Sequence, residues 1–583
     1  MTVFRAKRAR RYWLALLLAG LACPAGLACP IVTQAQDFDR VRPKLPTAAP
    51  VPPLIAPKQA LVSTDQTVLV PDLKGLVFVN SAGAISDTPV DPTRLNGGIS
   101  VTGTPLLANA AFLAQAQSYL NHPLTLADLD ALRSLARKVY IAHDRPFIDI
   151  RVPPQNVQTG VIYVVVTEYR IGDISVSGNK YFSTQQIAHM GGLKSGQFLT
   201  LPTLRGALDD YNSNPFLTVS AVARPGAQDG ITNIDLQATD RRPFRVYAGY
   251  DNQGVPSLGT EEWFAGVNFG NLFGTGQVLS YQYTRSFTGR YSSHSLTDII
   301  PINPDNRLWI FGAYATQVPG IAPGFRGTGH SGQLSIRFVH DLPRTASLVQ
   351  SLRLGLDYKR TDNNLEFSGF RLLDSKVEIF QMPFSYNATI TDRYGQTAIE
   401  NLVVLSPGNV TEYNRDENLR QLVAFADSSY IYDRLTVTRT TNLPAGFSWT
   451  IRALTQQASS NLPYSEQIGG GGLGSLRGYD PNTALGSEGL LLSQDLRTPV
   501  LSAPGRLDDR LQFGLFWDYV HTRQHTPVPD QPDSLTLSSA GLGAYYNAGR
   551  YFNLQFEVGN QLEPAPGQRD RDLRAVMTAS FGY

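Results

Sequence analysis

The chain has 583 residues, a formal net charge of +2 and only 17% charged residues, and it is rich in glycine (51) and tyrosine (26). This length suits several domains, or one large architecture with smaller domains attached. Nucleic-acid-binding proteins need a clustered basic face, and the balanced charge with no such face argues against that class.

The N-terminus has the layout of a secretory signal peptide. A basic start precedes an apolar stretch from Tyr12 to Ala22, and small residues continue to Ala28. We therefore predict a signal peptide over residues 1–35, cleaved after Ala28 or Ala35. A membrane anchor is the alternative, and the short apolar stretch disfavours it. The basic residues are Arg5, Lys7, Arg8, Arg10 and Arg11.

Both cysteines, Cys23 and Cys29, lie in or beside this segment. Lipidation is not expected, because Gly20 and Gly26 stand where a lipid-modified cysteine normally has a leucine. The mature chain then keeps at most one cysteine, which excludes a disulfide framework. No apolar run long enough for a membrane-spanning helix follows residue 35, so the exported protein is either soluble or an outer-membrane β-barrel.

Residues 36–68 form a proline-rich N-terminal segment. Proline favours extended chain, which predicts a tether, and it disfavours a long helix that could plug a pore. A tether, a disordered leader and a plug all remain open for this segment. Its prolines are Pro43, Pro46, Pro50, Pro52, Pro53 and Pro57.

Two small α+β domains are predicted next, over residues 69–168 and 169–240. Each has the order strand, helix, helix, strand, strand, with helical spacing such as that of Leu129, Leu132 and Leu135 on one face. The segments of the first domain are 69–81, 108–120, 126–141, 147–152 and 160–167. Those of the second are 169–176, 183–190, 202–212, 218–224 and 230–238.

From residue 243 to 583 the helical spacing stops and short alternating segments follow, such as SLRLGLDYKR around Leu354. This alternation predicts strands with one apolar and one polar face. A soluble β-sandwich array and a membrane barrel both fit, and the abundant tyrosine and low charge favour the barrel. At about 20 residues per strand with its turn, this length predicts roughly 16 strands, enough for an aqueous lumen. The chain ends in alternation up to Phe581 and Tyr583.

One stretch late in this region, IGGGGLGSLRGYD from Ile468 to Asp480, is unusually rich in glycine. We interpret it as a loop folded into the lumen, with Arg477 as its anchor. Glycine allows positive φ angles and close packing against the wall. A solvated loop charge is the alternative, and a phosphate-binding loop is excluded because the following Lys and Ser/Thr are missing. The glycines are Gly469, Gly470, Gly471, Gly472 and Gly474.

The chain resembles the two-partner secretion transporters (TpsB type) of the superfamily that includes the BamA-like barrel-assembly factors. The resemblance rests on the run from Pro146 to Asn179, on the loop motif LRGY, and on GLFWDYV from Gly514 to Val520, which is similar to the family's F-x-D strand. It implies a mainly β fold, with a 16-stranded antiparallel transmembrane β-barrel preceded by two periplasmic POTRA domains. One departure is that Tyr519 and Val520 follow Asp518, where the family often has x-Gly.

The resemblance implies a loop latch in the lumen, formed by Arg477, Gly478 and Tyr479 of the loop and by Asp518 of the wall. An Arg–carboxylate pair would satisfy a cation that is costly to leave unpaired, and Tyr479 would pack beside it. Phe516 belongs to the partner strand. Phe581 and Tyr583 would form the C-terminal assembly signal.

The implied function is secretion of one partner protein through the barrel, without enzymatic activity. Expected partners are a large secreted passenger of adhesin or haemolysin type, the barrel-assembly machinery and outer-membrane lipid, with no nucleic acid. No catalytic set, cofactor or metal site is predicted. A BamA-like assembly factor is the alternative function, and a passive porin is a further one.

Overall fold

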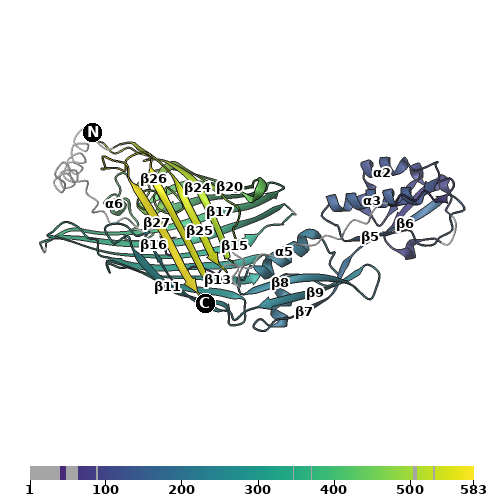
Figure 1. The fold of residues 1–583 in the computed structure, drawn as a ribbon, viewed down its shortest axis with the longest axis horizontal. Coiled ribbons are helices and arrows are strands. Elements are labelled where there is room, and N and C mark those ends of the chain that lie inside the picture. The colour runs from purple at the N-terminus through teal and green to yellow at the C-terminus, as the bar shows by residue number, and fades with distance from the viewer. Residues whose placement is uncertain are drawn as a thin grey trace, which may run out of the picture.

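The computed structural model describes residues 38, 40–46, 63–86, 90–345, 347–368, 370–502, 509–529 and 532–583, so the predicted signal peptide lies outside the described residues. Two small α+β domains precede a closed β-barrel, and the second domain lies between the first and the barrel (Figure 1). Within the described residues, no helix is both long and apolar enough to cross a membrane.

The first domain packs two helices on one face of a four-stranded sheet with the strand order β3-β2-β6-β5. Thr125 begins the longer helix in a capping box with Asp128, which satisfies free amide groups of the first turn. Strand β3 lies where the sequence analysis predicted no element. The elements are β1 (Val68–Val70), β2 (Gly75–Val79), β3 (Ile99–Thr102), α2 (Ala110–Gln117), β4 (Leu124–Thr125), α3 (Leu126–Ala142), β5 (Ile148–Arg151) and β6 (Val161–Glu168).

The second domain has the order strand, helix, helix, strand, strand, and its sheet has the order β7-β9-β8. Leu204, Leu208 and Tyr211 on one helix pack against Val219 and Leu236 of the sheet in a single apolar core. Thr200 caps that helix. The elements are β7 (Arg170–Ser177), α4 (Thr184–Met190), α5 (Leu201–Asn212), β8 (Leu217–Pro225) and β9 (Ile231–Asp240).

The barrel is closed and antiparallel, and its first strand pairs with its last. Ser280, Gln282 and Thr284 of one strand are buried on the lumen side, whereas Tyr281 and the residues alternating with it face outward. The predicted 16-stranded fold is confirmed. Its strands are β10 (Phe244–Asp251), β11 (Glu262–Leu272), β12 (Gln277–Ser286), β13 (Tyr291–Asn303), β14 (Asn306–Gln317), β15 (Phe325–Asp341), β16 (Leu348–Phe367), β17 (Phe370–Asp392), β18 (Gly395–Pro407), β19 (Ser429–Asn442), β20 (Ser448–Ala458), β23 (Glu488–Arg497), β24 (Asp509–Arg523), β25 (Ser534–Ala548), β26 (Phe552–Gln561) and β27 (Leu573–Gly582).

The second domain contacts the rim of the barrel where β10 begins, which we call the near rim. The Nδ2 of Asn214 donates to the carbonyl oxygens of Gly270 (2.5 Å) and Gly276 (3.1 Å). Phe216 packs so closely on Gly270 that a Cβ there would come within 1.9 Å of its ring. Arg344, after β15, reaches Asp210 of α5 at 2.9 Å. These contacts hold the second domain next to the opening of the lumen.

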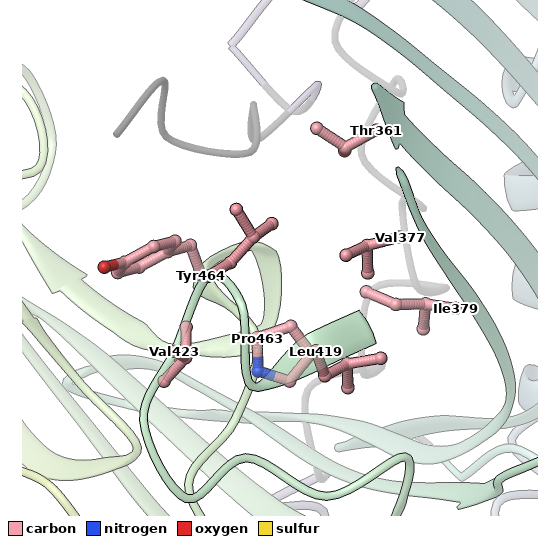
Figure 2. A pocket seen from close by; sticks show the side chains of 8 residues that line it. Thr361, Val377, Ile379, Leu419, Val423, Pro463 and Tyr464 are labelled. Carbon is pink, nitrogen blue, oxygen red and sulfur yellow. The ribbon is translucent and has the colours of Figure 1, made fainter. Parts of the chain in front are cut away.

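Two long loops lie at the opposite, far rim, residues 408–428 and 459–487. The first contains α6 (Asp416–Leu419), and the second contains the small hairpin of β21 (Ile468–Gly470) and β22 (Ala484–Gly486). Figure 2 shows where they meet the wall, in a small apolar pocket. Its lining comes from both loops and from the inner faces of β16 and β17: Thr361, Val377, Ile379, Leu419, Leu422, Val423, Pro463 and Tyr464.

Candidate functional site

The glycine-rich loop lies inside the barrel, against the inner faces of β23 to β26. The side chain of Arg477 is 4% exposed, and that of Asp518 on β24 is 0% exposed. The Nε of Arg477 donates to Oδ2 of Asp518 at 2.7 Å, and its second terminal nitrogen donates to Oδ1 at 2.6 Å. The backbone amide of Arg477 also donates to Oδ2 at 3.0 Å. This bidentate geometry fixes both the position and the orientation of the loop tip.

Two further carboxylates contact Arg477, and sequence reasoning did not identify them. Asp495 on β23 accepts a hydrogen bond at 2.8 Å, and Glu557 on β26 lies at 3.4 Å. Burial lowers the pKa of Arg477, but the carboxylates around it outweigh this effect and raise the pKa above its ordinary value. The guanidinium therefore stays charged, and it joins the loop to three strands of the wall.

Phe516, predicted as part of the partner strand, lies beneath this guanidinium with its ring centre 3.8 Å from the Cζ of Arg477. Phe516 and Asp518 are two residues apart on β24, so both side chains face the lumen. The spacing of the F-x-D motif thus supplies an aromatic face and a carboxylate to one cation. Such stacking is worth about 2 kcal/mol when the cation is desolvated.

Tyr479 is fully buried, and it packs on Val520, two residues beyond Asp518 on the same strand. Its ring packs with Leu476, Val520 and Leu537, whereas Phe516 is the aromatic residue beside the ion pair. Its hydroxyl lies 2.9 Å from the carbonyl oxygen of Ser538 and 2.6 Å from that of Glu563. Burial raises the pKa of Tyr479 to about 12, so the hydroxyl remains a hydrogen-bond donor. Tyr479 therefore attaches the loop to β25 and to the segment after β26.

The glycines of the loop allow close packing against the wall and positive φ angles. Gly470 lies against Val520, whose methyl groups would be 3.1 Å from an added Cβ, so the wall leaves little room there. Gly478 has a φ of +98° and meets the backbone of Gly559, a combination that other residues adopt only with strain. Gly471, Gly472 and Gly474 also have positive φ angles, whereas Gly469 faces the side chain of Leu485.

A second charged contact holds the start of the same loop, and the sequence analysis gave no indication of it. Glu466 is 2% exposed, and it accepts hydrogen bonds from Lys359 on β16 at 2.5 Å and from Tyr432 on β19 at 3.0 Å. Gln381 on β17 adds a third at 3.0 Å. Lys359 precedes Glu466 by more than a hundred residues, and no local spacing connects them.

The described part of the predicted tether or plug, residues 38 and 40–46, lies against the lumen wall. Phe38 and Val41 pack with Leu258, Tyr291 and Phe311 in an apolar cluster. The described residues contain no helix: the amide of Val41 donates to the carbonyl oxygen of Phe38 at 3.2 Å in a turn, the chain bends at Arg42, and residues 43–46 have no regular structure. They therefore occupy part of the lumen in a non-helical form.

The two aromatic residues of the predicted assembly signal lie at the near rim. Phe581 on β27 faces outward and is 57% exposed, and it is paired with Ala248 and Phe552 on the neighbouring strands. The backbone of Tyr583 exchanges hydrogen bonds with Val246 at 2.9 and 3.2 Å. The C-terminus thus closes the barrel against its first strand.

Comparison with known proteins gives matches for the barrel and for the first small domain. Residues 230–546 match the model of the haemolysin secretion/activation proteins ShlB/FhaC/HecB, and residues 97–168 match the ShlB-type POTRA domain. The heme/hemopexin transporter protein HuxB of Haemophilus influenzae (strain 86-028NP) is 21% identical over 464 residues, covering 75% of this chain and 78% of HuxB. The outer membrane transporter CdiB of Dickeya dadantii (strain 3937) is 23% identical over 471 residues, covering 78% of this chain and 80% of CdiB.

The fold agrees with a solved relative. CdiB from Escherichia coli superposes with a TM-score of 0.74 at 18% identity, covering 92% of this chain and 94% of that one. The fold therefore combines a barrel with POTRA domains, and the small domains lie on the periplasmic side with the far rim outside the cell. The family model spans more than half of the chain, which accordingly belongs to the ShlB/FhaC/HecB family of haemolysin secretion/activation proteins, outer-membrane transporters of two-partner secretion.

Proposed function

We propose that this transporter exports one large passenger of adhesin or haemolysin type through its lumen, and that the loop latch of Arg477, Gly478, Tyr479 and Asp518 is required for export. The observation that carries this is the buried ion pair between Arg477 and Asp518 (2.6 and 2.7 Å), which connects an extracellular loop to the lumen wall. A buried charge cluster of this kind is costly to assemble and favours one loop position over others.

The two edge strands of the second domain, β7 and β8, are the surfaces that we expect to receive the unfolded passenger. An extended peptide can add to a sheet edge through main-chain hydrogen bonds, which tolerate sequence variation. The contacts of Asn214 with Gly270 of the near rim and of Asp210 with Arg344 of the near rim keep these edges beside the lumen. The passenger would then pass outward in extended form and fold outside the cell.

The expected remaining partners are the barrel-assembly machinery and outer-membrane lipid. Recognition of Phe581 and Tyr583 by that machinery is supported by the outward-facing side chain of Phe581 at the near rim and by the pairing of Tyr583 with β10. Apolar outward residues such as Leu542 (61% exposed) and Leu354 (59% exposed) suit contact with lipid. No nucleic acid is expected as a partner.

The test is export of the passenger by an Arg477→Ala variant. Removing one partner of a buried pair costs about 3–5 kcal/mol, so we expect export to fall by about tenfold or more. Folding of the barrel is checked by gel electrophoresis, in which a folded barrel migrates differently before and after heating. Export at the level of the unchanged protein would refute the role of the latch. A general loss of other outer-membrane proteins in a deletion strain would instead indicate an assembly factor.

A further inference from the structure

The inner face of β10 to β14 holds a short segment of the chain itself, residues 40–46, which we call the strap. Arg40 contacts Glu262, the first residue of β11 at the far rim. Lys44 contacts Asn268, six residues further along the same strand toward the near rim. The strap therefore runs along the wall in the direction in which a passenger would have to move.

The wall contacts the main chain of the strap at Lys44. The backbone amide of Lys44 donates to the hydroxyl of Tyr247 at 2.9 Å. Its carbonyl oxygen accepts from Arg245 at 3.2 Å and from Asn268 at 3.3 Å. These hydrogen bonds involve peptide groups, which every residue in an extended segment presents.

A second main-chain contact lies at Val41. Its carbonyl oxygen accepts from the hydroxyl of Ser295 at 2.6 Å and from Nε2 of Gln282 at 3.4 Å. Because the donors are side chains of the wall, an extended peptide can bind there without adding a strand to the barrel. The backbone contacts do not depend on the sequence of the peptide.

The side-chain contacts of the strap make the wall selective for basic residues, and the first of these contacts is at Arg40. Its guanidinium pairs with Glu262, through a second nitrogen at 3.2 Å, and lies 3.9 Å from Asp251. The carboxylate of Glu262 is 1% exposed and that of Asp251 is 12% exposed. Two nearly buried carboxylates favour a cation at this position.

The next two alternate residues of the strap are also cations, and they face aromatic rings. The guanidinium of Arg42 lies 5.0 Å from the ring of Trp309 and 5.1 Å from that of Phe311. The ammonium of Lys44 lies 5.9 Å from the ring of Phe264. Cations are attracted to such rings, so the wall presents three cation-binding places, which take every second residue of the strap.

We propose that this wall is a binding track for the exported polypeptide, which holds a segment with basic side chains at every second position, and that the strap occupies the track until such a segment replaces it. The proposal rests on the proposed function, because it specifies the chemistry of the passenger in the lumen.

Peptide binding to the full-length protein in detergent tests the track. A variant in which Arg40, Arg42 and Lys44 are all replaced by glutamine should loosen the strap, because it removes all three cation contacts; we call it the released variant. The probe is a fluorescent peptide FDRVRPKLP, the sequence of residues 38–46, and its control has glutamine in place of the three cations. We expect the probe to bind the released variant more tightly than it binds the unchanged protein. The control peptide should bind the released variant more weakly than the probe does, by about tenfold or more. Equal binding of probe and control would overturn the proposal.

A matched pair of substitutions locates the binding. Glu262→Gln in the released variant should weaken binding of the probe by about tenfold or more, because it removes a buried counter-charge. Glu261→Gln makes the same change on the neighbouring, exposed residue and should have no effect. If the Glu262→Gln and Glu261→Gln variants bind the probe equally well, the wall does not select basic segments, and the strap only fills part of the lumen. The proposed function would survive that result if Arg477→Ala still stopped export, so the two ideas fail separately.

Discussion

Gly478 of the lumen loop and Gly559 of β26 meet backbone to backbone. A Cβ on Gly559 would lie 2.6 Å from the amide nitrogen of Gly478, closer than real side chains approach. The carbonyl oxygen of Gly478 accepts a hydrogen bond from Gln561 at 3.0 Å, two residues further along the same strand. The loop can therefore reach the wall only because both contacting residues lack a side chain.

A Gly559→Ala substitution should push the loop away from the wall without unfolding the barrel. The added methyl group meets backbone atoms, which cannot rotate away, and overpacking of this kind costs about 1–3 kcal/mol. When intact cells are treated with protease, we expect faster cleavage within residues 468–486 of the variant. We also expect reduced export of the passenger. Gly312→Ala on β14 is the control, because a Cβ there meets nothing within 4 Å. Equal protease sensitivity of the two variants would contradict the steric explanation.

Asp518→Asn should weaken the latch less than Arg477→Ala does. The amide keeps the size of the carboxylate but removes its charge, while Asp495 still contacts Arg477 at 2.8 Å. We expect a loss of about 1–3 kcal/mol in the preference of the loop for the wall, seen as more frequent channel opening in planar bilayers.

Asp374→Asn provides the comparison for that experiment. Asp374 pairs with Arg371 at 2.7 Å on the exposed β17 strand end, and exposed pairs contribute about 0–1 kcal/mol. Channel openings should therefore match those of the unchanged protein. A similar effect of both substitutions would mean that charge alone, and not the buried contact, controls the loop.

The sequence was sufficient for the barrel and for the principal pair of the site. Alternating strands repeat a period of two residues over the last part of the chain, and that signal survives without any tertiary information. Arg477 was singled out by the glycine-rich loop around it, and Asp518 by the resemblance of GLFWDYV to the family's F-x-D strand. Phe516 was predicted as well, although the cation–π contact with Arg477 became visible only in the structure.

The remaining contacts depend on barrel closure. Asp495, Glu557 and Glu466 are single acidic residues without a motif, and each meets its partner only because the barrel brings distant strands together. The same holds for the strap, whose prolines predict an extended chain but do not indicate the wall of β10 to β14. Strand β3 was missed because its four residues are too few for a periodic pattern.

Arg344→Ala should loosen the second domain from the barrel. Arg344 contacts Asp210 of α5 at 2.9 Å and Asp341 at the end of β15 at 3.1 Å. Without it, two carboxylates with little solvent access face each other, which is unfavourable. We expect faster amide exchange in residues 201–212 and slower export. The exposed Arg371→Ala variant should leave both unchanged, and unchanged exchange in Arg344→Ala would show that Asn214 and Phe216 suffice for docking.

Docking of the second domain should also depend on pH through Asp210. Burial raises the pKa of Asp210 from 3.8 to about 6, and Arg344 opposes this shift only in part, while Asp341 and Asp209 add to it. Asp341 and the burial against the barrel rim act only on the docked domain, so we expect the docked state to bind the proton more tightly than the undocked state. This contribution to docking is fully present below pH 3.8 and is lost as the pH rises through about 6.

Between pH 5 and pH 7 the free energy that favours the docked over the undocked state should accordingly fall by about 1 kcal/mol, since one pKa unit corresponds to about 1.4 kcal/mol. Amide exchange in residues 201–212, corrected for its intrinsic pH dependence, measures this change. An Asp210→Asn variant cannot take up the proton, so its docking should vary much less over the same range. Asp209→Asn leaves Asp210 intact and should keep most of the dependence. If Asp210→Asn retained the full change, another group would have to be responsible, and the burial of Asp210 would not control docking.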